Sequence, residues 1–517
     1  MFTNRWCKVM VNKPLRLTER RTFLKSTAVA GIAALAGCTG GGGGDGGDGS
    51  GGDGGDGGDG SDGSGGDGGD GGTTTGEPDN GLKWEGVEIE YWNRLGTNTK
   101  LAEPAIRQAI KNFEEDTGAT VNVTWARTEA LNQWLTLFQE GRRPHVMDQP
   151  TGGSGPFVQL DSVKPYEDYQ QWFSDETVEN ISWMMDRVGP MVYGGFDGKA
   201  YDMKFSNEGV RTFIVRADHA EEAGISVEDE FPPEDHEHSV QIGQTLQEDG
   251  PADYGWQIYG STGDVTDTYT EDTPACYGGV DGVCLNSDWT DTNIDNEHFL
   301  RSYEEFVALL TEHELSHPES VSMSDEDATG LLIEGTASMT SVPPASYADV
   351  LGQAPEMIEN GQFYFSTNWK GSSGARGIVG GDGIMFPKPP EGTDEDEWNT
   401  KQEAAADLMD NYLFFSEFFQ EQMFTTIGGG PIREDMTAED VMSAVSDPTG
   451  YEQTNIINAT LNGAFDNDNI IIEPQAPMYS AVQQGVLPPQ IQQAMQGSKS
   501  VEKALNDAAE EARNRFF

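Results

Sequence analysis

An alternation of strand and helix patterns begins at residue 87, and it restricts the fold more than any other feature of the chain. Residues 87–92 and 121–125 alternate apolar and polar side chains, as strands half-buried in a sheet do. Each is followed by a window, 103–117 and 131–138, in which apolar residues recur on one helical face. Strand, helix, strand and helix in succession are typical of an open α/β sheet. We therefore predict an α/β fold.

Polar side chains stand where two of the predicted strands end. Trp92, Asn93 and Arg94 end the first strand, and Asp148 and Gln149 end a later one. In open α/β sheets, ligands bind beyond the carboxyl ends of the strands. The sequence therefore predicts a binding site at this edge.

Short motifs along the chain occur in the order found in one protein family. Arg143-Pro144-His145-Val146 is similar to a Pro-Asp-Val turn, with His145 in place of the acid. The other matching segments are 157–169, Asp197-Gly198-Lys199-Ala200-Tyr201, 215–225, 334–339, 428–433 and 500–505. Together they resemble the family 1 extracellular solute-binding proteins of ABC importers, a group that includes maltose-binding proteins. The resemblance covers nearly all of residues 84–517.

The resemblance implies a periplasmic-binding-protein-like type II fold, in which two α/β lobes joined by crossing segments close on a ligand. Residues 77–517 are too many for one core, which agrees with two domains. By resemblance, 77–205 and 341–387 form one lobe, and 206–340 and 388–517 form the other. It also implies that the chain is not an enzyme, needs no cofactor, acts as a monomer and delivers its solute to ABC permease subunits.

A carbohydrate is the solute that the side chains favour. Sugars present apolar faces and hydroxyl edges, so a sugar site combines aromatic rings with acids and amides. The candidate ligand residues are Trp92, Asn93, Asp148, Gln149, Glu208, Trp256, Tyr259, Trp369, Gly381, Asp382 and Tyr479. Core packing is the alternative role for each tryptophan. A non-sugar solute such as a polyamine, a peptide or a phosphate ester stays open, and Arg211 would suit an anion.

The N-terminal residues have the order of an export signal. Arg20-Arg21 precedes a short apolar run, and Leu35-Ala36-Gly37-Cys38 follows it. The pattern resembles a twin-arginine signal with a lipobox, so residues 1–37 would be removed and Cys38 lipidated. The apolar run is shorter than the ~20 residues that span a bilayer, so the lipid would anchor the protein to the outer face of the membrane.

The segment that follows is almost wholly Gly, Asp, Ser and Thr. Residues 39–76 contain eight aspartates and no basic residue, so they cannot bury apolar surface and are predicted to form a disordered tether after Cys38. The acidity continues beyond it. Seven of 31 basic and nine of 88 acidic residues lie at or before Gly76, which leaves a net charge of −55 on residues 77–517. This charge predicts adaptation to molar salt, and it excludes nucleic acid as a partner.

Two further patterns have competing interpretations. Cys276 and Cys284 bracket a glycine-rich loop in a chain with an export signal, which predicts a disulfide; free thiols or half of a metal site are the alternatives. His313-Glu314-Leu315-Ser316-His317 fits the H-E-x-x-H motif of zinc proteases. Pro318 follows at once, and no third histidine lies downstream, so we expect no metal there and no catalysis.

Overall fold

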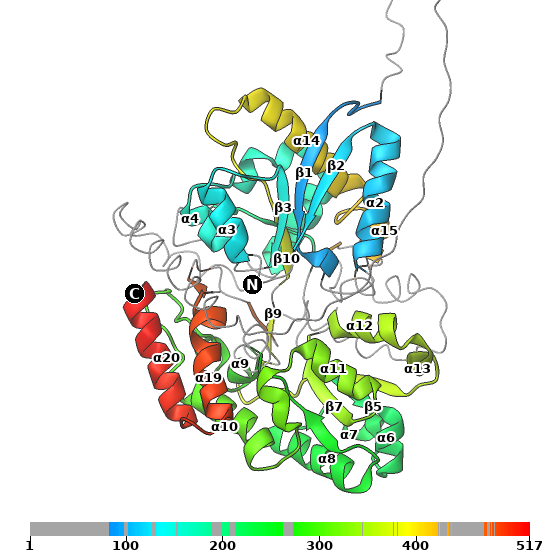
Figure 1. Cartoon of the computed structure of the whole chain (residues 1–517), viewed down its shortest axis with the longest axis vertical. Coiled ribbons are helices and arrows are strands. Elements are labelled where there is room, and N and C mark those ends of the chain that lie inside the picture. Colours follow the sequence, from blue (N-terminus) through cyan, green and yellow to red (C-terminus); the bar gives the residue numbers. More distant parts are fainter. Residues whose placement is uncertain are drawn as a thin grey trace, which may run out of the picture.

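The computed structural model describes most of the predicted folded part. The described residues are 82–97, 102–126, 131–150, 153–187, 199–206, 212–261, 272–343, 345–375, 377–379, 381–421 and 481–517, with shorter pieces at 423, 432–433, 436, 470–472, 476 and 478–479. Two mixed sheets lie in separate halves of the molecule (Figure 1). The predicted α/β class is confirmed.

The first lobe contains a five-stranded sheet in the order β2-β1-β3-β10-β4. Its strands are β1 (Glu88–Asn93), β2 (Thr120–Trp125), β3 (Val146–Pro150), β4 (Met203–Lys204) and β10 (Asp382–Met385). β2, β1 and β3 are parallel, whereas β10 runs antiparallel to both β3 and β4. The helices of this lobe are α2 (Ala102–Thr117), α3 (Leu131–Gln139), α4 (Gly155–Gln159), α5 (Asp175–Arg187), α14 (Glu395–Asn411) and α15 (Glu417–Glu421).

The apolar stripes predicted from the sequence cover the two faces of this sheet. Ile106, Ile110 and Phe113 of α2 belong to one buried cluster, together with Ile89 and Tyr91 of β1. The opposite face packs Trp134 and Phe138 of α3 against Trp92, Met147 and Phe157. Residues two apart in a strand share a face, so the alternation along β1 divides its side chains between two helical layers.

The second lobe is built on a four-stranded sheet in the order β6-β7-β5-β8. Its strands are β5 (Thr212–Arg216), β6 (Tyr254–Gln257), β7 (Ala337–Val342) and β8 (Phe363–Thr367). Its helices are α6 (Ala217–Glu222), α7 (Val227–Glu230), α8 (His236–Asp249), α9 (Thr273–Gly278), α10 (Glu297–Thr311), α11 (Asp325–Ile333), α12 (Ala345–Gln353), α13 (Pro355–Glu359), α19 (Leu487–Met495) and α20 (Val501–Phe516). Among the described residues, no helix is long and apolar enough to span a bilayer.

The chain divides between the lobes at other points than predicted. β8 pairs antiparallel with β5 along its whole length, so residues 345–367 lie with the second sheet and not with the first. α14 packs its apolar face into the core under β1, so residues 395–411 lie with the first sheet and not with the second. The resemblance predicted the order of the motifs along the chain. The points at which the chain passes from one lobe to the other depend on strand pairing and helix packing, which the motifs do not specify. Between the lobes, β9 (Gly377–Val379) pairs in parallel with β11 (Ile470–Ile472) (Figure 1).

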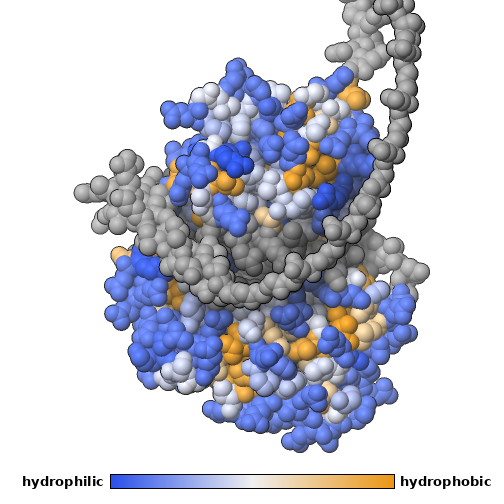
Figure 2. Space-filling view, viewed as in Figure 1, coloured by the Kyte–Doolittle hydropathy of each residue, from blue (hydrophilic) through white to orange (hydrophobic). Residues whose placement is uncertain are grey.

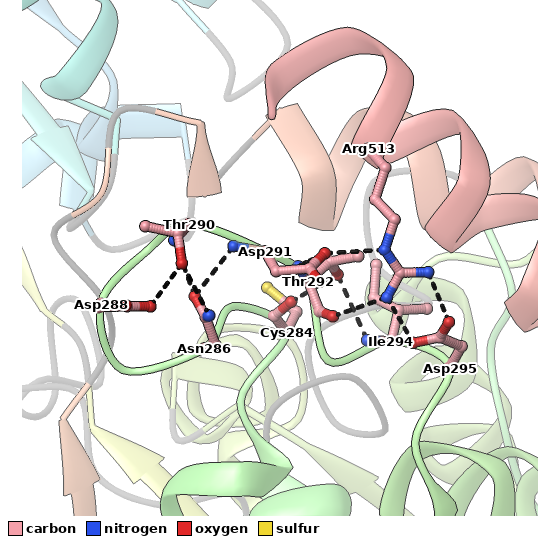
Figure 3. Close-up of polar contacts among 9 residues, drawn as sticks. All are labelled: Cys284, Asn286, Asp288, Thr290, Asp291, Thr292, Ile294, Asp295 and Arg513. Atoms are coloured by element: carbon pink, nitrogen blue, oxygen red, sulfur yellow. Dashed lines mark hydrogen bonds and ion pairs between the residues drawn. The ribbon is translucent and has the colours of Figure 1, made fainter. Parts of the chain in front are cut away.

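The C-terminal helix α20 is held by an ion-pair network at its last turn. The Arg513 guanidinium donates to Asp291 at 2.8 Å and to the two carboxylate oxygens of Asp295 at 2.6 and 3.0 Å (Figure 3). The loop that contains Asp291 and Asp295 begins near Cys284, whose carbonyl oxygen accepts a hydrogen bond from the Thr292 hydroxyl at 2.7 Å. The visible described surface of both lobes is mostly hydrophilic (Figure 2), as the acidic composition predicts.

Candidate functional site

Asp148 of β3 is the centre of a buried polar cluster at the carboxyl ends of β1 and β3. One carboxylate oxygen accepts from the Tyr91 hydroxyl at 2.8 Å and from the Asn93 amide at 3.0 Å. The other accepts the backbone N–H groups of Arg94 and Leu95 at 2.9 and 3.2 Å. Tyr91, Asn93 and Asp148 are fully buried. These bonds fix the turn that leaves β1, because each backbone donor there has an acceptor.

Arg94 connects this cluster to a third strand. Its guanidinium forms an ion pair with Asp382, the first residue of β10. The backbone N–H of Asp382 in turn donates to the Ser206 hydroxyl at 3.0 Å, and the Phe205 N–H donates to the Asp382 carbonyl at 3.0 Å. The structure therefore brings Asn93, Asp148 and Asp382, which the sequence had named separately, into one connected group.

Electrostatics in this cluster balance burial against hydrogen bonding. Burial raises the pKa of Asp148, while the Arg94 charge and its hydrogen-bond donors act in the opposite direction. Burial, and then the charge of Asp148, hold the pKa of Tyr91 well above its usual range, so Tyr91 is a hydroxyl donor at neutral pH. Arg94 faces Asp382 and Asp148, so its positive charge is compensated inside the protein.

Gln149 lies beside this cluster on the other face of β3, where Asp202 also lies. Gln149 and Asp202 are each 1% exposed. The Ser154 hydroxyl donates to one Asp202 oxygen at 3.3 Å. Burial raises the pKa of Asp202 to about 6, against the charge of Lys204. Sequence reasoning missed Asp202, although it directly follows the Asp-Gly-Lys-x-Tyr motif that ends at Tyr201.

The aromatic residues proposed as ligand platforms are placed in the cores. Trp256 is fully buried, and its ring lies 5.5 Å from Phe213. Trp369 and Tyr479 belong to the same cluster. Trp92 is 6% exposed and packs 5.4 Å from Trp134, and Tyr259 belongs to a smaller core cluster with Ile214 and Tyr347. These side chains stabilise the lobes here, and contact with a ligand stays a prediction for them.

The remaining predicted residues are Gly381, which the structure describes, and several that it does not. Gly381 is buried beside Asp382, and its φ of 146° is a backbone conformation that residues other than glycine rarely adopt. Glu208, Arg211, Cys38 and the predicted tether lie outside the described residues.

The two cysteines of the second lobe are both buried. The sequence predicts a disulfide between Cys276 and Cys284, and the two side chains are 0% and 1% exposed. The Cys276 sulfur lies 3.9 Å from the Trp369 carbonyl. The pairing stays a prediction.

The zinc-motif residues do not share a helical face. α10 ends at Thr311, before His313, and Glu314 has a φ of +54°. His317 caps a short 3-10 helix, where its Nδ1 accepts the Glu319 N–H at 3.1 Å. H-E-x-x-H binds zinc through histidines one helical turn apart, and that geometry is missing here. Within the described part of the chain, no cluster of three or more His, Cys, Asp or Glu residues could hold a metal.

A pocket of about 590 Å³ lies in the second lobe, away from the strand ends. α8, α10 and the start of α20 form it, and its lining includes His236, His313 and Glu305. None of the predicted ligand residues in the described part of the chain lines it.

Comparison with known proteins relates the chain to solute-binding proteins. Residues 108–449 match the family model described as bacterial extracellular solute-binding protein. Among solved structures, an ABC transporter solute-binding protein from Thermotoga lettingae TMO bound with α-D-tagatose is 17% identical, with a TM-score of 0.64 over 83% of this chain and 99% of that one. No curated protein matches the chain.

Two further solved structures have similar scores. Maltose-bound MalE3 of T. maritima is 16% identical, with a TM-score of 0.62 over 83% of this chain and 99% of that one. An ABC transporter solute-binding protein from Agrobacterium radiobacter K84 in complex with ribitol is 16% identical, with a TM-score of 0.63 over 84% and 100% of the two chains. At such identities the match establishes the shared fold.

Proposed function

Because the chain belongs to the bacterial extracellular solute-binding protein family, we propose that it captures a small carbohydrate or polyol and delivers it to an ABC permease. The observation that carries the ligand class is the polar cluster at the ends of β1, β3 and β10. It gathers the carboxylates of Asp148 and Asp382 and the amide of Asn93, groups of the kind that sugar sites use, at the place where α/β sheets hold ligands.

Charge in the cluster favours a neutral solute over an anion. Arg94 is the cation of the described cluster, and its ion pair with Asp382 already offsets its charge. A phosphate ester or a carboxylate would be repelled by the carboxylates of Asp148 and Asp382, which costs binding energy. The ligands of the similar proteins, tagatose, maltose and ribitol, are neutral polyhydroxyl compounds and agree with this proposal.

Capture would follow from closure of the two lobes. A solute shifts a protein between open and closed states only when it binds the closed state more tightly. β9 and β11 pair between the two lobes (Figure 1). A solute that bridged the lobes would report its presence to the permease as a change of shape.

Export and anchoring complete the proposal. The Arg20-Arg21 signal would carry the folded chain outward, and a lipid on Cys38 would hold it at the outer face of the membrane. A Gly-rich coil of the length of residues 39–76 spans roughly 35 Å on average, and repulsion among its aspartates extends it further. The tether would then let the receptor meet its permease, and the acidic surface suits molar salt.

Thermal unfolding and calorimetry in molar salt test the ligand class. We expect α-D-tagatose, maltose or ribitol to raise the melting temperature and to release heat on titration. Small-angle scattering should show a smaller radius of gyration with the binding sugar. A melting temperature that responds to putrescine, a peptide or a phosphate ester but to no sugar or polyol would contradict the carbohydrate proposal.

A further inference from the structure

Gln149 and Asp202 each bury a polar atom that has no hydrogen-bond partner in the described part of the structure. These atoms are Gln149 Nε2, a donor, and Asp202 Oδ1, an acceptor. Both side chains are 1% exposed, so bulk water does not solvate them. Buried polar groups are almost always hydrogen-bonded, and a pair that is not requires an explanation.

The two side chains belong to the same face of the sheet and flank a position without a side chain. Gln149 of β3 and Lys204 of β4 pair with Gly383 of β10 from its two sides. Asp202 lies two residues before Lys204 and therefore shares its face. A Cβ at Gly383 would lie 3.0 Å from the Met203 carbonyl oxygen and 3.4 Å from the Asp202 Cβ, so glycine lets β4 approach β10 closely beside Asp202.

Two consecutive residues, Gly153 and Ser154, lie close to the two side chains. The Ser154 hydroxyl donates to Asp202 Oδ2 at 3.3 Å, which leaves Oδ1 as the remaining acceptor. A Cβ at Gly153 would lie 3.1 Å from Gln149 Oε1, so the backbone of Gly153 lies close to the Gln149 amide. The Ser154 hydroxyl thus helps to fix the Asp202 carboxylate, and Gly153 leaves space for the Gln149 side chain.

We propose that Gln149 and Asp202 form a subsite for one hydroxyl group of the bound solute, with the Gln149 amide donating a hydrogen bond to the hydroxyl oxygen and Asp202 accepting a hydrogen bond from the hydroxyl. This inference rests on the proposed function. It adds a residue, Asp202, that neither the motifs nor the β1–β3–β10 cluster identifies. Gln149 directly follows Asp148 in β3, so the subsite lies on the opposite face of the strand from the Asp148 side chain.

A hydroxyl fits this pair better than charged groups do. An ammonium group cannot accept from the Gln149 amide, and a carboxylate would be repelled by Asp202. A hydroxyl both donates and accepts, and so it satisfies the two atoms together. A buried water has the same capacity and is the competing occupant.

Binding measurements on two matched variants separate a ligand contact from a structural one. Asp202→Asn keeps the size of the side chain and removes the charge of the acceptor. Asp410→Asn is the control, because Asp410 is a buried aspartate of the same lobe whose partners are Ser174 and Thr177.

The probes are α-D-tagatose, maltose and ribitol, titrated into each folded protein. We expect Asp202→Asn to weaken the binding of the best probe about tenfold or more, as loss of a charge-assisted hydrogen bond does. Asp410→Asn should leave affinity within about twofold.

A crystal structure with glycerol decides the subsite independently of solute identity. We expect a glycerol oxygen within hydrogen-bond distance of both Gln149 Nε2 and Asp202 Oδ1. Unchanged affinity in Asp202→Asn, or water alone between the two side chains at molar glycerol, would overturn the subsite. If wild-type protein binds none of the three probes, the carbohydrate proposal fails, and the glycerol structure alone decides the subsite.

Discussion

The Arg94 guanidinium at the end of β1 forms a buried ion pair with Asp382, which begins β10 288 residues later. The two side chains are 7% and 4% exposed. The pair ties the return of the chain from the second lobe to the strand end that carries Asn93 and, through it, Asp148. It therefore holds together a site whose parts come from distant segments.

Breaking this pair on one side should destabilise the protein strongly. Asp382→Ala leaves the Arg94 charge buried without its partner, which costs about 3–5 kcal/mol. Replacing both residues, as Arg94→Met with Asp382→Leu, removes both charges and should cost less than the single change. Urea unfolding in molar salt measures the three proteins. A double variant less stable than Asp382→Ala would show that the pair contributes net stability.

The sequence predicted the class of fold and the polar residues at the ends of β1 and β3, because local patterns determine both. The alternation of 87–92 and the stripe of α2 became a strand and its covering helix, and the polar ends of β1 and β3 meet, as parallel strands require. Long-range pairing is not visible in a local pattern. For this reason the partner of Arg94 and the side of the molecule on which β8 lies were not predictable.

The tryptophans show the same limit. A ring that binds a sugar and a ring that fills a core are the same side chain, and only its neighbours distinguish them. The ring of Trp256 packs beside Phe213 and His236 in the core of the second lobe. Asp202 was missed for the opposite reason: in a chain with 88 acids, one more aspartate attracts no attention until its burial is known.

His145, which stands where the family motif has an acid, should make stability depend on pH. Its Nδ1 accepts the Glu90 N–H at 2.8 Å, and burial lowers its pKa to about 4. The unfolded chain takes up this proton near pH 6.5, so the free energy of unfolding falls as pH drops from 6.5 to 4, by roughly 3 kcal/mol. His145→Asn keeps an acceptor without titrating. Wild type and variant should therefore converge toward pH 4 in urea unfolding, and a constant difference would contradict this cause.

Asp202 should make stability depend on pH in the opposite direction to His145. Its folded pKa of about 6 lies above the ordinary value of about 3.9, so the folded state holds the proton more tightly. Its contribution is present below pH 4 and is lost as pH rises through 6, a change of about 3 kcal/mol. Asp202→Asn removes this loss. Relative to that variant, wild type should become less stable between pH 4 and 6, and a flat difference would show that burial does not control this carboxyl.

Arg513 provides a test of the C-terminal anchor against salt. Its guanidinium joins α20 to Asp291 and Asp295, but the side chain is 39% exposed, so solvent screens the network and Arg513→Gln should cost about 1 kcal/mol or less. The Debye length falls from about 10 Å at 0.1 M salt to about 3 Å at 1 M, and the cost should shrink accordingly. Arg515→Gln is the matched control, because Arg515 pairs with Glu511 inside the same helix and not with the loop. Hydrogen exchange should speed up in 284–296 for Arg513→Gln alone. Equal exchange in both variants would mean that apolar packing of α20, and not the ion pairs, fixes this loop.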